Sequence, residues 1–266
     1  MTSIKDILIC FLILPLTGLA MIMSESSSAE DLSFAEAINK AGRQRMLTQR
    51  ITKNYCQIGL NVVPDKSRHE LEKAINLFSS QLLELERFSP DTEVDMVLDN
   101  VKPHWNSFKD LALSVPSQEN AKRLTEMDEE LLHASEHLVQ MLENLSGVST
   151  SRLVNIAGRQ RMLSQRLTKF YMLRLWNQGS PAMNSEIERA TNEFKGALDT
   201  LVQAPENTIT IKEKLEAAKL QWAWFSSSLN YSQDEHFPLI TLDASEKMLQ
   251  IMERVTELYQ NVSKNN

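Results

Sequence analysis

Glycine is scarce in this sequence, with seven residues among 266, and no glycine-rich phosphate-binding loop can be found. Residues that favour helices dominate instead, chiefly leucine, glutamate, alanine, lysine, glutamine and methionine. Proline occurs only at a few separated places. The expected fold class is therefore all-α.

Cysteine is also rare, and the net charge is negative. Only Cys10 and Cys56 occur, and Cys10 lies in a segment that we expect to be removed on export, so no internal disulfide is expected. Cys56 is interpreted as a buried small apolar residue. The formal net charge of −7 argues against a general nucleic-acid binder, which needs a basic face. Any anion site must be local.

Long apolar runs are absent except near the N-terminus. Residues 7–23 are apolar, are interrupted by Pro15 and Gly18, and precede a polar, serine-rich stretch, a pattern typical of a signal peptide. We therefore expect residues 1–29 to be a signal peptide and the protein to be periplasmic. An uncleaved inner-membrane anchor is the alternative, because an acidic residue offsets the lysine before the apolar run. No second hydrophobic segment follows, so the paired spans of a one-piece receptor are not expected.

The remainder of the sequence is an internal repeat. Residues 38–55 recur as residues 154–171 at an offset of 116. Further along, Trp105 and Phe108 correspond to Trp222 and Phe225 at an offset of 117. The expected organisation is two tandem helical repeats, residues 30–146 and residues 147–266, each an up-and-down bundle of about four helices.

Apolar residues recur at helical spacing, and proline, glycine and serine mark the joints between segments. The helices expected from this pattern lie near residues 31–60, 66–88, 92–114 and 118–146 in the first repeat, and near 150–177, 182–203, 206–231 and 236–262 in the second. Ser117, after Pro116, is the expected N-cap of the fourth helix. The short joint at residues 146–151 is only a weak helix stop, so the possibility of a long central helix shared by both repeats stays open.

The repeated motif places the same side chains on one stripe of a helix in each copy. The stripe consists of Ala41, Gly42, Arg45 and Gln49 in the first copy, and of Ala157, Gly158, Arg161 and Gln165 in the second. A buried guanidinium needs an anionic partner, and its planar fork of donors suits an oxyanion. The small residues one turn earlier allow a helix or ligand to approach closely. If the two motif helices face each other, one small anion can bridge both arginines, and the residues of both stripes are the expected ligand-binding residues.

Residues 41–51 and 157–167 resemble the signature of the type IV pili methyl-accepting chemotaxis transducer N-terminal domain, the PilJ-like family. The resemblance covers nearly all of residues 30–266 as two tandem copies. The same stretches are similar to the periplasmic P-box of nitrate and nitrite sensor kinases, whose helical bundles bind nitrate between two motif helices of a dimer.

This resemblance implies signal transduction by nitrate or nitrite sensing, with Gly42 and Arg45, and their counterparts Gly158 and Arg161, as ligand-binding residues. Lys40 matches a further P-box position, but its counterpart is Ile156, so the resemblance assigns no shared role there. The known receptors continue into a membrane span and a signalling domain, whereas this sequence stops. Direct signalling across a membrane is therefore not implied, and a membrane receptor or other signalling protein is the kind of partner considered.

A structural role is the alternative for the motif. In it, Arg45 and Arg161 form buried ion pairs with glutamates such as Glu130 or Glu143. The other motif arginines are interpreted as solvated or packed against carboxylates; they are Arg43, Arg50, Arg159 and Arg166.

The paired histidines and the tryptophans are interpreted as structural residues. His133 and His137 have metal-ligand spacing on one helix, but two ligands do not make a site, and an ordinary helix surface is favoured. Trp105, Trp222 and Trp224 are expected to be core anchors.

No nucleophile, base and orienting group occur in a recognisable arrangement, so we expect neither an enzyme nor a cofactor. The first hypothesis is an exported sensor module that binds a small inorganic oxyanion, nitrate or nitrite, and passes the bound state to a partner. Whether the site forms within one chain or in a homodimer stays open. The alternative is a helical interaction protein that docks onto a membrane receptor or a pilus-related component.

Overall fold

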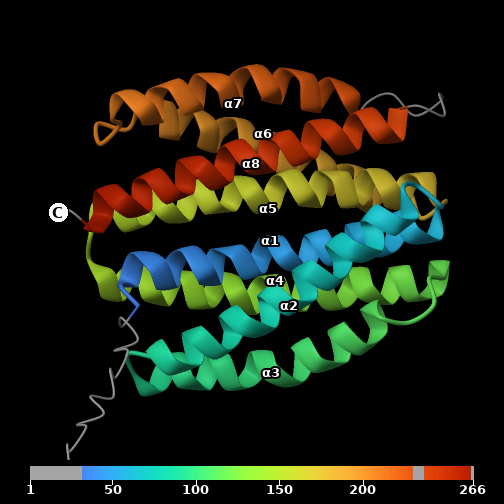
Figure 1. Cartoon of the computed structure of the whole chain (residues 1–266), viewed down its shortest axis with the longest axis horizontal. Coiled ribbons are helices and arrows are strands. Elements are labelled where there is room, and N and C mark those ends of the chain that lie inside the picture. Colours follow the sequence, from blue (N-terminus) through green and yellow to red (C-terminus); the bar gives the residue numbers. More distant parts are fainter. Residues whose placement is uncertain (1–31, 230–236, 265–266) are drawn as a thin grey trace, which may run out of the picture. The chain divides into compact units, whose positions relative to one another are not determined.

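The computed structural model describes residues 32–229 and 237–264, which contain eight α-helices and no strand. The helices are α1 (Phe34–Gly59), α2 (Pro64–Phe88), α3 (Thr92–Ala112), α4 (Gln118–Ser146), α5 (Ser149–Leu175), α6 (Pro181–Gln203), α7 (Ile209–Ser228) and α8 (Phe237–Lys264) (Figure 1). The all-α expectation is confirmed, and every expected helix end lies within three residues of the observed one.

The signal peptide expected at residues 1–29 lies outside the described residues. Among the helices that the structure describes, none is both long and apolar enough to span a membrane.

The two motif helices, α1 and α5, lie side by side at the centre of the helical unit that begins at Leu32 (Figure 1). α4 packs against α1, and α8 packs against α5. The α2–α3 pair covers α1 and α4, and the α6–α7 pair covers α5 and α8. The two repeats therefore share one core, in which each motif helix is surrounded by other helices.

Helix starts follow local capping chemistry. Ser33 caps α1 in a capping box, in which its hydroxyl accepts from the Glu36 N–H and the Glu36 carboxylate accepts from the Ser33 N–H. Ser117 caps α4 as expected, because its Oγ accepts from the Asn120 N–H at 3.1 Å.

The long central helix that the sequence left open does not form. α4 ends at Ser146 because Gly147 adopts a left-handed conformation, with φ 63°, and donates its N–H to the Glu143 carbonyl. Val148 is extended, and α5 starts at Ser149. A left-handed glycine followed by an extended residue reverses the chain, which brings α5 back along α1.

Aromatic residues at equivalent places anchor both repeats. Phe78 stacks on Trp105 at 3.8 Å between ring centroids, and Phe194 stacks on Trp222 at 4.0 Å. Trp224 is not a core anchor, because 72% of it is exposed. It follows Trp222 by two positions, which is about 200° around a helix, so it points outward from α7. Cys56 is fully buried, as expected.

Candidate anion-binding site

Arg45 on α1 and Arg161 on α5 meet between the two motif helices, and both are fully buried. A Cβ built on Gly42 would lie 3.0 Å from Nη2 of Arg45 and 3.8 Å from Nη2 of Arg161. A Cβ on Gly158 would lie 3.0 Å from Nη2 of Arg161 and 3.7 Å from Nη2 of Arg45. Both guanidinium groups therefore face the same two glycines.

Geometry explains why glycine occupies both positions. A contact of 3.0 Å between an added methyl group and a guanidinium nitrogen is tight, so alanine at either position would require that arginine to shift by a few tenths of an ångström. Ala41 and Ala157 precede the glycines and are also fully buried. The two glycines thus leave room on the facing sides of α1 and α5 for the guanidinium groups of both arginines.

Each central arginine is ion-paired with a glutamate from the last helix of its own repeat. Arg45 Nη1 lies 2.5 Å from Glu136 Oε2 on α4, and Arg161 Nη1 lies 2.6 Å from Glu253 Oε2 on α8. Buried ion pairs were expected as the structural alternative, but with Glu130 or Glu143 as partners, and this assignment is wrong.

The positions of those two glutamates explain the error. Glu130 is exposed on α4. Glu143 accepts instead from Nδ2 of Asn155 at 2.6 Å. Asn155 in turn accepts with Oδ1 from Arg45 Nη2 at 2.9 Å, so Glu143 is linked to the arginine only through this asparagine.

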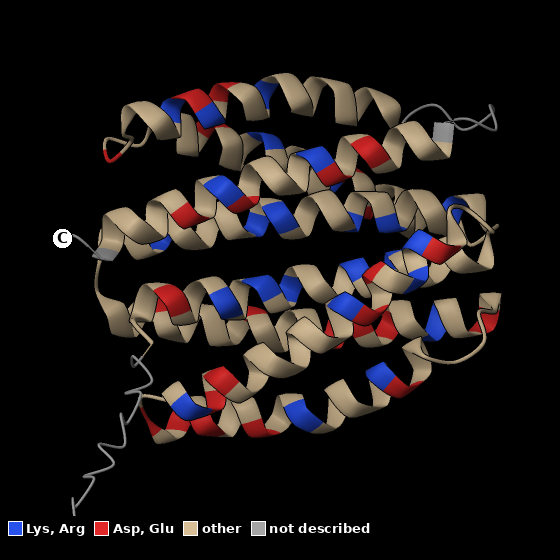
Figure 2. Ribbon diagram, in the orientation of Figure 1, with Lys and Arg blue, Asp and Glu red and all other residues tan. Residues whose placement is uncertain are grey.

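Each glutamate also binds a flanking arginine from the other repeat. Arg159 on α5 shares Glu136 with Arg45, at 2.6 Å, and Arg43 on α1 shares Glu253 with Arg161. Burial raises the pKa of Glu136, but Arg45 and Arg159 outweigh it and hold that pKa below its ordinary value. Figure 2 shows basic residues along both α1 and α5. The flanking arginines thus pack against carboxylates and connect the repeats.

The electrostatic position of the central arginines is unfavourable. Burial lowers the pKa of Arg45. Burial, and then the nearby charges of Arg43 and Arg45, lower the pKa of Arg161 well below its ordinary value, although Glu257 opposes this. The Nε atoms of Arg45 and Arg161 are buried and have no hydrogen-bond partner among the described residues. An added anion would relieve the repulsion and supply acceptors.

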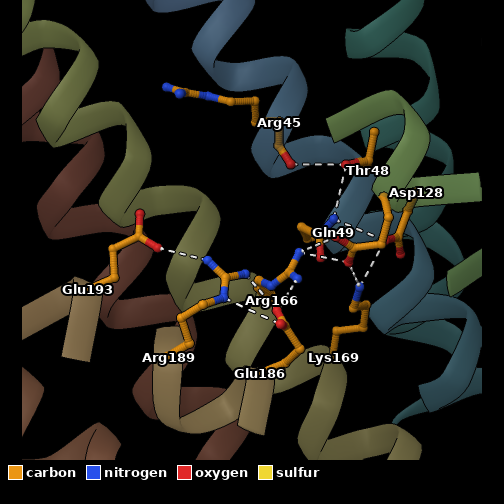
Figure 3. A network of polar contacts seen from close by, with 10 residues as sticks. Arg45, Thr48, Gln49, Asp128, Arg166, Lys169, Glu186, Arg189 and Glu193 are labelled. Atoms are coloured by element: carbon orange, nitrogen blue, oxygen red, sulfur yellow. Dashed lines mark hydrogen bonds and ion pairs between the residues drawn. The ribbon is translucent and has the colours of Figure 1, made fainter. Parts of the chain in front are cut away.

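Gln49 and Gln165 do not join the arginine pair. Gln49 Nε2 donates to Asp128 Oδ1 at 3.1 Å, and Gln165 Oε1 accepts from Lys53 Nζ at 2.8 Å. Figure 3 shows the Arg45 side chain pointing away from the cluster formed by Thr48, Gln49 and Asp128. The expected stripe therefore divides into an arginine layer and a separate polar layer one turn further along.

That polar layer contains a buried ion pair that the sequence did not reveal. Asp128 Oδ1 lies 2.8 Å from Lys169 Nζ, and both side chains are fully buried. Burial raises the pKa of Asp128 to about 6, although Lys169 opposes the shift. The counterpart of Asp128 in the second repeat is Ser245, which accepts from Gln165 at 3.3 Å, so the two repeats differ here.

The glutamate partners could have been found from the repeat itself. Glu136 and Glu253 are separated by 117 residues, the same offset that relates Trp105 to Trp222. His133 lies near Glu136 at the wall of a groove rather than with further ligands. No group of three or more histidine, cysteine, aspartate or glutamate residues suited to a metal occurs in the part of the chain that the structure describes.

Comparison with known proteins assigns the family. A family model for the type IV pili methyl-accepting chemotaxis transducer N-terminal domain, PilJ, matches residues 27–129 and 146–223. No curated protein and no solved structure matches the chain. The matched segments include both arginine motifs and cover more than half of the chain. PilJ is a sensory and transducer family rather than a catalytic one. The chain belongs to the PilJ family of type IV pili methyl-accepting chemotaxis transducer N-terminal domains.

Proposed function

We propose that this PilJ-family sensor domain binds a small oxyanion, nitrate or nitrite, between α1 and α5 and passes the bound state to a signalling partner. The observation that carries the proposal is the pair of fully buried arginines, Arg45 and Arg161, which face the same two glycines. Burying two adjacent guanidinium groups is costly, and an oxyanion that accepts from both would offset that cost. The proposed ligand-binding residues are these arginines with Gly42 and Gly158.

The proposed site needs only one chain. Two equivalent helices of a symmetric dimer can hold one ligand on the symmetry axis, and here the two repeats supply both helices. The ligand would then change the relation between α1 and α5, to which α4 and α8 are attached through Glu136 and Glu253. We further propose a periplasmic location, based on the signal-peptide pattern of residues 1–29.

Isothermal titration calorimetry with sodium nitrate and then sodium nitrite, at constant ionic strength, tests the proposal. We expect saturable binding at one site per chain. Arg45→Ala and Arg161→Ala should each weaken binding about 10- to 100-fold, because each removes charge-assisted hydrogen bonds. Arg45→Lys and Arg161→Lys should also weaken it, since lysine lacks the planar fork.

Arg50→Ala and Arg166→Ala are the matched controls. Both arginines lie on the same helices and pair with glutamates, Arg50 with Glu70 and Arg166 with Glu129, away from the central pair. These variants should bind nitrate as the wild type does. Circular dichroism of every variant separates loss of binding from loss of fold. A wild-type chain that binds neither anion contradicts the proposal.

A second candidate function is docking to a protein partner without a ligand. Leu220 and Trp224 lie one turn apart on α7 and are 73% and 72% exposed. Their counterparts on α3 are Pro103 and Ser107, so the apolar face belongs to the second repeat alone. Large exposed apolar side chains of this kind often mark interaction surfaces. If nitrate and nitrite fail to bind, docking of a protein partner on this surface becomes the leading functional hypothesis.

A further inference from the structure

Two surface grooves are lined by the glutamates that pair with the central arginines. One, of about 700 Å³, lies between α1, α2 and α8 and is lined by Arg43 and Glu253 among others. The other, of about 570 Å³, lies between α4, α5 and α6 and is lined by Arg159 and Glu136. The two grooves are equivalent under the internal repeat, because Arg43 corresponds to Arg159 and Glu253 to Glu136.

The glutamates stand between the grooves and the arginines. The side chains of Glu136 and Glu253 are 22% and 26% exposed, whereas Arg45 and Arg161 are not exposed at all. A solute in either groove therefore meets a carboxylate before it reaches a central guanidinium. Each carboxylate already occupies one edge of that guanidinium, at 2.5 Å for Arg45 and 2.6 Å for Arg161.

Each glutamate has a second partner that would remain if it left the central arginine. Glu253 binds Arg43 through Oε1, while Oε2 binds Arg161. Glu136 binds Arg159 Nη1 at 2.6 Å and accepts from Gln140 Nε2 at 3.2 Å through its other oxygen. Neither carboxylate would be left as an unpaired charge, so the cost of releasing it is reduced.

We infer that Glu136 and Glu253 are internal competitors of the oxyanion, each of which must give up its central arginine before the anion can bind there. This inference rests on the proposed function and adds the residues that set its affinity and association rate. An incoming anion and a carboxylate on the same guanidinium would repel each other, so occupancy by one opposes the other. Because the glutamates belong to α4 and α8, their release also couples binding to both helices.

The test combines calorimetry with stopped-flow kinetics on Glu136→Gln, Glu253→Gln and the double variant, using nitrate as the probe. Glutamine keeps the size of the side chain but removes the competing charge. We expect nitrate to bind each single variant about tenfold more tightly, and to associate faster. Without nitrate the variants should have a lower Tm, and nitrate should raise that Tm by more than it raises the wild-type value.

Glu246→Gln and Glu129→Gln are the matched controls. Each lies seven residues before the tested glutamate, Glu246 on α8 and Glu129 on α4, and lines the same groove. Each substitution removes one negative charge, but from a carboxylate that pairs with a lysine, Lys53 or Lys169, and not with a central arginine. Their nitrate affinity should stay within about threefold of the wild type, since only a distant, screened charge changes.

The outcomes separate this inference from the proposed function. If the wild type binds nitrate and the Glu136 and Glu253 variants bind it equally or more weakly, the glutamates only support the structure and the inference is overturned. If nitrate binds the wild type, binds the double variant more tightly still, and is bound more weakly by both after Arg45→Ala, the inference is supported. If nitrate binds to no variant and not to the wild type, the proposed function fails and the inference fails with it.

Discussion

At the scale of single residues, the candidate site contains glycines that lower helix propensity but leave space for the arginine side chains. Gly42 and Gly158 lie within helices, where glycine is less favourable than alanine by about 1 kcal/mol. Both are needed for the close approach of the arginines, since an added Cβ would lie 3.0 Å from the nearest guanidinium nitrogen. The motif is therefore optimised for the position of Arg45 and Arg161 and not for helix stability alone.

Gly158→Ala should separate these two effects. The new Cβ would displace the Arg161 guanidinium, so we expect nitrate to bind about tenfold more weakly in calorimetry. The free energy of unfolding should change by less than about 1 kcal/mol, because the gain in helix propensity offsets the displaced side chain. The control is Gly196→Ala on α6, where nothing lies within 4 Å of the added Cβ. That variant should be about 0.5 to 1 kcal/mol more stable and bind nitrate normally. Unchanged affinity in Gly158→Ala would show that the guanidinium position is unimportant.

Glu246 provides a prediction about pH. Burial raises the pKa of Glu246, but Lys53 and Arg50 outweigh it and lower that pKa from 4.5 to about 2. Between these values the unfolded chain binds more protons than the folded chain, so stability is present above about pH 4.5 and is lost as the pH falls to about 2.

Glu246→Gln should remove this part of the acid sensitivity. We expect the free energy of unfolding to be lower than that of the wild type by about 2 to 3 kcal/mol at pH 6, and the difference to shrink as the pH falls toward 2. Urea denaturation at a series of pH values measures both quantities. Two curves that run parallel from pH 6 to about pH 2 would contradict the assigned role of the ion pairs.

At the scale of elements, the helices could be predicted and their pairing could not. Helix spacing and capping residues predicted all eight described helices, including the N-cap of α4 at Ser117. The break between α4 and α5 was predicted to be weak, because the presence of a glycine does not by itself show that the backbone adopts a left-handed conformation there. Trp224 was misplaced for a related reason: helical spacing puts it and Trp222 on opposite sides of α7, and only packing shows which of the two faces inward.

Gly147→Ala tests the stop between α4 and α5. Gly147 has φ 63°, a conformation that costs a residue with a Cβ about 1 kcal/mol. We expect the free energy of unfolding in urea to fall by about that amount, and to fall less for Gly147→Asn, because asparagine tolerates this conformation better. Nothing lies within 4 Å of the added Cβ, so a steric clash does not confuse the comparison. An equal loss in both variants would argue against backbone strain as the cause.

At the scale of the whole molecule, the two repeats behave as the halves of a dimer within one chain. The motif helices α1 and α5 pack on each other, and flanking arginines cross between the repeats to reach Glu136 and Glu253. The symmetry is incomplete, since Asp128 of the first repeat corresponds to Ser245 of the second. The pseudo-symmetric pair therefore keeps its central arginines while its surroundings differ between the repeats.

The sequence by itself determined the all-α class, the helix positions, the repeat, and the equivalence of Arg45 and Arg161, because these depend on local spacing and on comparison of the chain with itself. Only the tertiary structure decided that both arginines face the same glycines and that Glu136 and Glu253 are their partners. The physical reason is that helical spacing gives the direction of a side chain around its own helix. It does not give the neighbouring helix, so contacts between residues far apart in the chain depend on how all the helices pack.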